Sequence, residues 1–281
     1  MTAPMLSTLI DVTTLVELQG HEHLRLFDCR SSLLDPSAGL AQYTVGHIDG
    51  AQYVDLNRDL SAEIIPGRTG RHPLPAPITF ATTLGRWGVD QDALVVAYDN
   101  DTGAYAARLW WMLRWLGHTN VAVLDGGYQA WLAAGQVPSN RIGSFPETAF
   151  TIRPASTRQV SAAELLAPQG RLLDARDRPR FDGKTEPIDP VAGHIPGAIC
   201  APFGANIDAA TGRFYSPAQL QQRFATLGVE PNAEVICYCG SGVTAAHNIL
   251  ALVHAGYPEP ALYPGSWSEW ITDPAHPVAT L

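Results

Sequence analysis

A cysteine stands where the sequence predicts the junction of a strand, a loop and a helix. Cys239 follows the apolar run 235–238, small residues occupy 240–244, and residues 245–253 have the pattern of a helix. Backbone N–H groups and the positive end of a helix dipole converge on a side chain at such a turn. A thiol there is expected to ionise easily, and the thiolate is the form that attacks. The sequence therefore predicts Cys239 as a catalytic nucleophile.

The loop after the cysteine is built to surround a sulfur atom. Gly240 and Gly242 permit a tight backbone that directs N–H groups inward. The hydroxyls of Ser241 and Thr244 can hydrogen-bond sulfur or a leaving group, although Thr244 could equally cap the following helix. We therefore predict the whole loop as a substrate-binding element: Gly240, Ser241, Gly242, Val243 and Thr244. The alternative, that Cys239 is a small core residue, fits poorly with a strand that runs into Gly-Ser-Gly.

The loop sequence CGSGVT at 239–244 resembles the active-site loop of the rhodanese superfamily. Within that family it is similar to the 3-mercaptopyruvate sulfurtransferase branch rather than to the thiosulfate branch, whose loop carries basic residues. The resemblance implies a sulfurtransferase that forms a persulfide on Cys239. It implies 3-mercaptopyruvate as the favoured donor with thiosulfate possible, and as acceptor cyanide or a thiol such as thioredoxin or glutathione. No cofactor or metal is expected.

The family resemblance also implies residues that bind an anionic donor. Residues 174–183 resemble a segment in which the arginine before an aromatic residue faces the site, which here is Arg180, and an arginine can bind a carboxylate bidentately. His72, in the sequence RHPLP, is a weaker candidate for polarising the substrate or relaying a proton. The alternative for His72 is an exposed loop histidine. Arg176 has a counterpart in Arg30, which favours an internal ion pair over a substrate contact.

The sequence departs from the mercaptopyruvate branch at one point. That branch has a second arginine before its Gly-His-Ile-Pro-Gly segment, and this chain reads TEPIDPVAG at 185–193. Asp189 at the same place would repel a carboxylate, and Lys184 or Arg178 would have to substitute. The donor assignment therefore stays open between 3-mercaptopyruvate and thiosulfate.

An internal duplication indicates two related domains. Residues 26–30 (LFDCR) recur as 172–176 (LLDAR), and 46–51 (GHIDGA) recur as 193–198 (GHIPGA). Short β-branched runs alternate with longer helical patterns in both halves, which favours a parallel sheet covered by helices. We predict an α/β protein of two tandem rhodanese-like domains, each a mainly parallel sheet with helices on both faces. Their predicted bounds are 1–140 and 157–281, with a polar linker at 141–156.

The two halves differ at the cysteine position. Asp99 stands where the second half has Cys239, and a carboxylate cannot take up sulfane sulfur as a persulfide. The first domain is therefore predicted to be catalytically inactive. An acidic metal loop at 99–101 is a poorer interpretation, since a calcium loop needs more oxygen donors at fixed spacing. His47 and His194 occur at the same place in both copies, so we expect structural roles, and His247 is expected to pack or to face outward.

Composition excludes several functional classes. A net charge of -9 and a pI of about 5.4 provide no basic surface for nucleic acid or an anionic membrane. No segment has the length and hydropathy of a membrane span or the form of a signal peptide. Four cysteines do not make a disulfide framework, so a cytoplasmic location is expected.

Three alternatives to catalysis of sulfur transfer by Cys239 remain. A non-enzymatic sulfur carrier or partner-binding rhodanese module has the same fold, but the complete loop argues against it. A phosphatase of this fold needs an arginine six positions after the cysteine, where this chain has Ala245. A redox pair of Cys237 and Cys239 is geometrically possible, because alternate positions of a strand share a face.

Overall fold

The computed structural model describes residues 4–281, which divide into two units by their internal contacts. The first unit takes the chain up to Ala62, with Pro75–Ser156 and Ala209–Phe214. The second unit comprises Glu63–Leu74, Thr157–Asp208 and Tyr215–Leu281. Segment 63–74 thus packs within the second unit although the predicted sequential division assigns it to the first. Residues 141–156, predicted as a linker, hydrogen-bond to the first unit, for example from Thr148 N–H to the carbonyl oxygen of Gly85 at 2.9 Å.

The first unit is built on a parallel sheet with strand order β1-β5-β4-β2-β3. The strands are β1 (Leu9–Ile10), β2 (Leu24–Asp28), β3 (Gln52–Tyr53), β4 (Leu94–Tyr98) and β5 (Val121–Leu124). Every residue of β2, β4 and β5 is buried, as expected of central strands covered on both faces. The β-branched runs seen in the sequence are therefore strands, as predicted.

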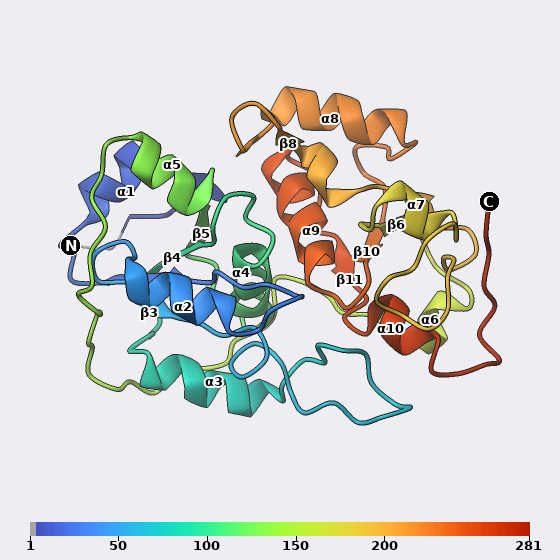
Figure 1. Ribbon diagram of the computed structural model, residues 1–281, viewed down its shortest axis with the longest axis horizontal. Coiled ribbons are helices and arrows are strands. Elements are labelled where there is room, and N and C mark those ends of the chain that lie inside the picture. The colour runs from blue at the N-terminus through green and yellow to red at the C-terminus, as the bar shows by residue number, and fades with distance from the viewer. Residues whose placement is uncertain (1–3) are drawn as a thin grey trace. The chain divides into compact units, whose positions relative to one another are not determined.

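Helices cover both faces of this sheet. They are α1 (Val12–Leu18), α2 (Ala38–Val45), α3 (Pro77–Arg86), α4 (Ala106–Trp115) and α5 (Gly127–Ala133). Leu15 of α1 and Trp131 of α5 belong to one core cluster with the side chains of one sheet face, and Figure 1 shows these two helices together. Helix α4 packs against β4 and β5 and contributes nothing to that cluster, so it covers the other face.

The second unit repeats this architecture with strand order β11-β10-β6-β7, again all parallel. These strands are β6 (Arg171–Asp174), β7 (Ile199–Cys200), β10 (Val235–Tyr238) and β11 (Ala261–Leu262). Two further short strands are β8 (Ile207–Asp208) in this unit and β9 (Arg213–Phe214) in the first. The register pairs Tyr238 with Asp174, so the ends of β10 and β6 lie at the same edge. The residues that follow both strands therefore meet there.

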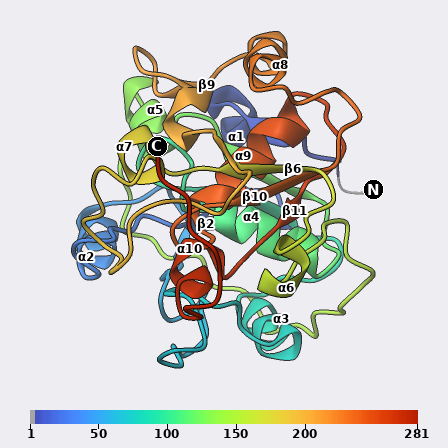
Figure 2. The same ribbon diagram turned by 90° about the vertical axis from the view of Figure 1, so that its right-hand side faces the viewer.

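The second unit also has helices on both faces of its sheet. They are α6 (Ala162–Leu165), α7 (Arg178–Phe181), the 3₁₀ helix η1 (Phe203–Asn206), α8 (Pro217–Thr226), α9 (Thr244–His254) and α10 (Ser266–Trp270). Leu165 of α6 and Trp267 and Trp270 of α10 share a core cluster with one sheet face. Helix α9 packs on β10 and β11 and also contacts α8; Figure 2 shows α8 and α9 on one side of β6, β10 and β11 and α6 on the other. The predicted α/β fold is confirmed.

The duplicated sequence segments form duplicated ion pairs. Arg30 binds Asp28 with 2.6 Å between Nη2 and Oδ2, and Arg176 binds Asp174 in the same way at 2.6 Å. All four side chains are buried, and each arginine also donates to a glycine carbonyl, that of residue 46 or 193. The prediction that both arginines are internal is confirmed.

The paired histidines are structural as well. His47 Nδ1 lies 2.9 Å from the carbonyl oxygen of Tyr43, and His194 Nδ1 lies 2.7 Å from that of Phe181. His247 of α9 is fully buried and contacts Asn206, which agrees with the expectation that it packs.

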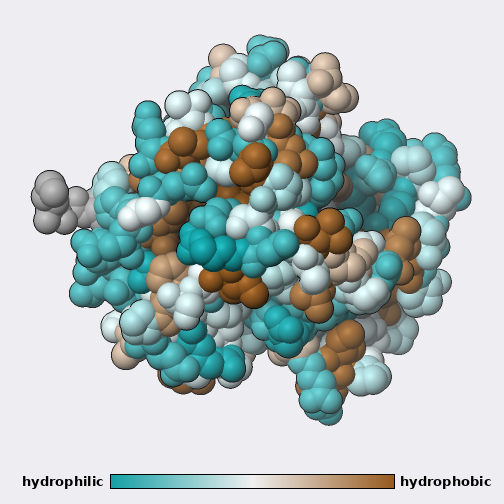
Figure 3. All heavy atoms as spheres, turned by 60° about the vertical axis from the view of Figure 1, so that its left-hand side comes forward, coloured by the Kyte–Doolittle hydropathy of each residue, from teal (hydrophilic) through white to brown (hydrophobic). Residues whose placement is uncertain are grey.

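The surface has no extended apolar face in the view that Figure 3 gives, where hydrophobic residues form small patches among hydrophilic ones. No helix within residues 4–281 combines the length and the hydropathy that crossing a membrane requires.

Candidate active site

Cys239 directly follows β10 and precedes α9, at the strand-loop-helix junction that the sequence predicts. Its backbone is fixed by α10. The N–H of Cys239 donates to Ser266 Oγ at 3.1 Å, and its carbonyl oxygen accepts from the N–H of Trp267 at 3.0 Å. Ser266 has a φ of 54°, the only positive φ of a non-glycine residue within 4–281. A residue in a strained conformation therefore holds the backbone of Cys239.

The loop places a backbone donor on the sulfur. The N–H of Gly242 donates to Cys239 Sγ at 3.1 Å. Gly242 has a φ of +78°, and a β-carbon there would lie 2.3 Å from the carbonyl oxygen of Pro264, so only glycine fits. Helix α9 begins at Thr244 with Val243 as its N-cap residue and no side-chain capping bond. The alternative that Thr244 caps this helix is therefore wrong.

Ser241 and His72 form a buried hydrogen bond beside the cysteine. His72 Nδ1 lies 2.8 Å from Ser241 Oγ, and the two residues are 7% and 4% exposed. His72 is therefore not an exposed loop histidine. The pair connects a group that can carry a proton to a hydroxyl two residues after Cys239.

Arg180 is held next to the loop by a carboxylate. Its Nη2 lies 2.7 Å from Glu186 Oε1, and its Nε also donates to Glu186 at 3.1 Å. A β-carbon on Gly240 would lie 3.4 Å from Arg180 Nη2, so the guanidinium stands directly over the residue that follows Cys239. Glu186 also accepts from Arg176 at 3.3 Å, which ties Arg180 to the internal ion pair of this unit.

Asp189, expected to repel a substrate carboxylate if it faced the donor, is instead engaged by protein cations. Its side chain is 3% exposed and binds two arginines: Arg71 through Oδ1, and Arg180 through Oδ2 at 3.2 Å. Lys184 and Arg178 do not substitute for a missing arginine, because both are mainly exposed and both bind Asp182. The second cation near the loop is Arg71. The sequence analysis did not select it as a site residue, although the adjacent His72 was selected.

The other cysteines are poor nucleophiles. All four cysteines are free thiols, and burial raises the pKa of Cys237 far above its ordinary value, with the neighbouring Cys239 adding to the effect. Burial also raises the pKa of Cys200 to about 11 and strongly raises that of Cys29. These three thiols stay protonated near neutral pH, so Cys239 is the candidate nucleophile.

The corresponding loop of the first unit is occupied by its own carboxylate. Asp99 follows β4, is 2% exposed, and accepts N–H groups from Gly103 and Tyr105 at 2.8 Å and from Ala106 at 3.2 Å. The N–H of Asp101 adds a longer bond at 3.3 Å. Burial raises the pKa of Asp99, and the backbone donors oppose that shift. This carboxylate serves the start of α4 and offers no nucleophilic sulfur.

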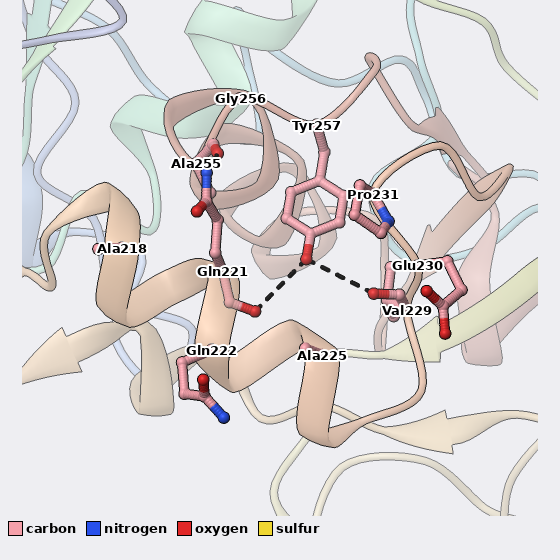
Figure 4. Close-up of a pocket in the computed structure, with 10 residues that line it drawn as sticks. All are labelled: Ala218, Gln221, Gln222, Ala225, Val229, Glu230, Pro231, Ala255, Gly256 and Tyr257. Carbon is pink, nitrogen blue, oxygen red and sulfur yellow. Dashed lines mark hydrogen bonds between the residues drawn. The ribbon is translucent and has the colours of Figure 1, made fainter.

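A separate cavity lies between α8 and the end of α9. It has a volume of about 350 Å³, and Figure 4 shows the Tyr257 hydroxyl between the carbonyl oxygens of Gln221 and Val229, at 3.4 and 3.5 Å. None of the predicted site residues lines it. Within residues 4–281 no cluster of histidine, cysteine and acidic side chains is suited to a metal ion.

Comparisons with known proteins agree with this geometry. The family model for the rhodanese-like domain matches residues 11–134 and 159–273. The chain is 54% identical over 263 residues to a probable 3-mercaptopyruvate sulfurtransferase of Pseudomonas aeruginosa, covering 92% of each chain. It is 32% identical to a thiosulfate sulfurtransferase of the same organism, covering 97% of each chain.

A solved structure has the same fold. The chain is similar to the crystal structure of SseA from Escherichia coli, described among 3-mercaptopyruvate sulfotransferases, with a TM-score of 0.81 and 30% identity. The similarity covers 94% of this chain and all of that one (100%). Both halves of the chain match the family model, and Cys239, the candidate nucleophile, lies in the predicted loop between β10 and α9. The chain belongs to the rhodanese family and carries two rhodanese-like domains in tandem.

Proposed function

We propose that the protein is a sulfurtransferase that moves a sulfane sulfur from 3-mercaptopyruvate to a thiol acceptor through a persulfide on Cys239. The observation that carries the proposal is the combination around this residue: a backbone N–H on its sulfur and two guanidinium groups over the next residue, Gly240. The first feature orients the attacking sulfur, and the second provides binding partners for an anionic donor. The higher identity to the 3-mercaptopyruvate relative supports this donor over thiosulfate.

The first half-reaction cleaves the carbon–sulfur bond of the donor. The Cys239 thiolate attacks the donor sulfur, a sulfur–sulfur bond forms, and the electron pair of the broken bond passes to the donor carbon. That carbon takes up a proton and leaves as the methyl group of pyruvate. Covalent catalysis of this kind divides one transfer into two easier displacements.

The hydrogen-bonded pair of Ser241 and His72 fits the proton requirement of this step. Charge develops on the keto oxygen and the departing carbon, and a hydroxyl backed by an imidazole can donate a hydrogen bond or a proton there. The 2.8 Å contact between His72 Nδ1 and Ser241 Oγ holds the hydroxyl ready. We assign the pair to substrate polarisation and proton relay.

The second half-reaction regenerates the enzyme. An acceptor thiolate, or cyanide, attacks the outer sulfur of the persulfide, and the Cys239 thiolate leaves. Thioredoxin and glutathione are thiols of the required kind. A reducing compartment such as the cytoplasm fits this chemistry, because the four cysteines are free and the persulfide needs a thiol to accept its sulfur.

Parallel steady-state assays test the proposed donor. Purified protein is given 3-mercaptopyruvate or thiosulfate, first with cyanide and then with a thiol as acceptor. We expect a higher kcat/KM with 3-mercaptopyruvate under both acceptors. A higher kcat/KM with thiosulfate would show that thiosulfate is the preferred donor. No turnover with either donor would favour a non-enzymatic sulfur carrier or binding module.

Substitution of Arg180 tests its contact with the donor. Arg180→Ala should raise the KM for 3-mercaptopyruvate by an amount that corresponds to about 1.5–3 kcal/mol, the strength of a hydrogen bond to a charged group. Arg180→Lys should already impair the enzyme, because lysine keeps the charge and loses the planar fork. Arg178→Ala is the matched control, since that arginine is mainly exposed and binds Asp182. An equal effect of both alanine variants would contradict the assignment.

Removing the Ser241 hydroxyl tests the proton relay. Ser241→Ala should lower kcat with 3-mercaptopyruvate by on the order of 10²-fold, the lower range of general acid–base effects. Thermal unfolding should change little, because the side chain loses one hydrogen bond. The loss should be much smaller for thiosulfate, whose leaving sulfite needs no proton on carbon. Equal losses with both donors would indicate a role in holding the loop instead.

A further inference from the structure

A cavity of about 460 Å³ lies at the carboxyl edge of the sheet in the first unit. Its walls include residues of α2 and α5, together with Arg30 and Asn100, which follow the neighbouring strands β2 and β4. From these two strands the chain continues to opposite sides of the sheet, to β3 and to β5. Open parallel sheets bind their ligands at such a point, and the volume is that of a small-molecule site.

One nitrogen atom of a buried arginine lines this cavity without a protein partner. The side chain of Arg30 is 4% exposed, its Nε and Nη2 bind Asp28, and Nη2 also donates to the carbonyl oxygen of Gly46. Within residues 4–281, Nη1 of Arg30 has no acceptor and stays accessible. A cationic donor with so little access to bulk water gains most from an anionic acceptor inside the cavity.

The second unit shows which acceptor suits this nitrogen. Arg176, the counterpart of Arg30, makes the same ion pair and the same bond to a glycine carbonyl. Its Nη1 donates to Glu186 Oε2 at 3.3 Å. The matching segment 31–45 of the first unit has one acidic residue, Asp35, which is exposed and does not line the cavity. The first unit therefore keeps the duplicated arginine and lacks the carboxylate that binds its Nη1.

Tyr128 of α5 adds a hydroxyl donor beside this guanidinium. Its ring lies under Arg30 with 4.3 Å between Cζ and the ring centroid. Trp267 takes the same place under Arg176 at 4.8 Å, and its Nε1 donates to the carbonyl oxygen of Val191. In the described chain the Tyr128 hydroxyl has no protein partner. Burial raises the pKa of Tyr128, so the hydroxyl stays protonated and can donate.

The remaining walls of the cavity are neutral and partly apolar. Val45 of α2, Leu132 of α5 and Pro138 line it, and Val45 is 85% exposed. Among the described residues that line the cavity, Arg30 alone is charged. One cation and one phenol hydroxyl beside apolar walls suit a carboxylate that is attached to an apolar body.

We propose that the first rhodanese-like domain binds a small monocarboxylate with an apolar body in this cavity. The carboxylate accepts from Nη1 of Arg30 and from the Tyr128 hydroxyl, in the role that Glu186 has toward Arg176. The apolar body lies against α2 and α5. Asp99 leaves this domain without a nucleophilic sulfur, so the ligand is bound and not converted. The proposal goes beyond sulfur transfer and does not depend on the donor that Cys239 uses.

Calorimetric titration with benzoate tests the ligand class. Benzamide is its neutral isostere, and acetate is a carboxylate without the apolar body. Benzoate should bind the full-length protein, and both comparison compounds should bind at least about tenfold more weakly, because each lacks one of the two interactions. Equal affinities for benzoate and benzamide would refute recognition of the carboxylate. The absence of measurable benzoate binding would refute the proposal as a whole.

A carboxylate introduced on the cavity wall locates the site. Replacing Arg30 itself would leave Asp28 buried without its cation, so the variant is made at Gln42, an exposed residue of α2 that lines the cavity. Gln42→Glu should compete for Arg30 and repel the ligand, which weakens benzoate binding at least about tenfold without lowering the Tm. Ala41→Glu is the matched control, because it adds the same charge at an exposed position of α2 outside the cavity. Its benzoate affinity should match the wild type.

Two outcomes of this comparison would contradict the proposed site. Unchanged benzoate affinity in Gln42→Glu would show that the ligand binds elsewhere. Equal losses in Gln42→Glu and Ala41→Glu would show a general effect of charge and no specific cavity.

Arg180→Ala separates this cavity from the loop around Cys239. Arg180 belongs to the second unit, so its removal should leave benzoate binding in the first domain at the wild-type affinity. Loss of benzoate binding in Arg180→Ala but not in Gln42→Glu would place the carboxylate beside Cys239 and refute the proposal. Absence of sulfur transfer by the wild type would refute the proposed function and leave the benzoate result as it stands.

Discussion

Replacing Cys239 with serine should abolish sulfur transfer. A hydroxyl in the same place does not ionise near neutral pH and cannot hold sulfane sulfur, so turnover should fall by on the order of 10⁴-fold or more. The fold should survive, because serine is close in size and the loop is fixed by backbone contacts to α10. Steady-state assays with 3-mercaptopyruvate and thermal unfolding measure the two effects.

Mass analysis of peptides checks the covalent step directly. The wild type incubated with donor and no acceptor should carry one additional sulfur atom on the peptide that contains Cys239. Cys200→Ser is the control, because burial raises the pKa of Cys200 to about 11 and that thiol stays protonated. Appreciable turnover by the Cys239→Ser variant would refute the persulfide mechanism, as would the extra sulfur on a different cysteine.

Replacing Asp99 with alanine should destabilise the protein while leaving the chemistry of Cys239 intact. The buried carboxylate accepts four backbone N–H groups, which alanine would leave without an acceptor. Each bond to a charged group contributes about 1.5–3 kcal/mol, and relaxation of the loop reduces the sum, so we expect a loss of about 3–5 kcal/mol in the free energy of unfolding. Denaturant titration gives the measurement.

The matched control lies two residues away. Asp101→Ala removes an exposed carboxylate of the same loop and should change the free energy of unfolding by no more than about 0.5 kcal/mol. The kcat of the folded Asp99 variant should match the wild type. If Asp99→Ala removed activity as completely as Cys239→Ser, the division of labour between the two rhodanese-like domains would be wrong.

Local sequence patterns were sufficient to predict the fold and the position of Cys239 between a strand and a helix. Central strands such as β4 and β5 are short apolar runs and the longer helices such as α4 and α9 have a helical pattern, so these elements can be recognised from local sequence. The duplication then implied two similar domains. The loop 239–244 is contiguous in sequence, and the conformation of such a turn depends on its own glycines. The buried ion pairs of Arg30 with Asp28 and of Arg176 with Asp174 could also be predicted, because both partners recur at the same spacing in the two halves.

Only the tertiary structure shows which residues from distant parts of the sequence lie beside the loop. Arg71 and Asp189 are 118 positions apart, and His72 and Ser241 are 169 apart. No local pattern encodes such a contact, because it depends on how segment 63–74 packs on the second unit. A carboxylate near a substrate anion suggests repulsion when only its charge is known. Once the fold places two guanidinium groups on Asp189, the same charge becomes the counter-ion that positions them.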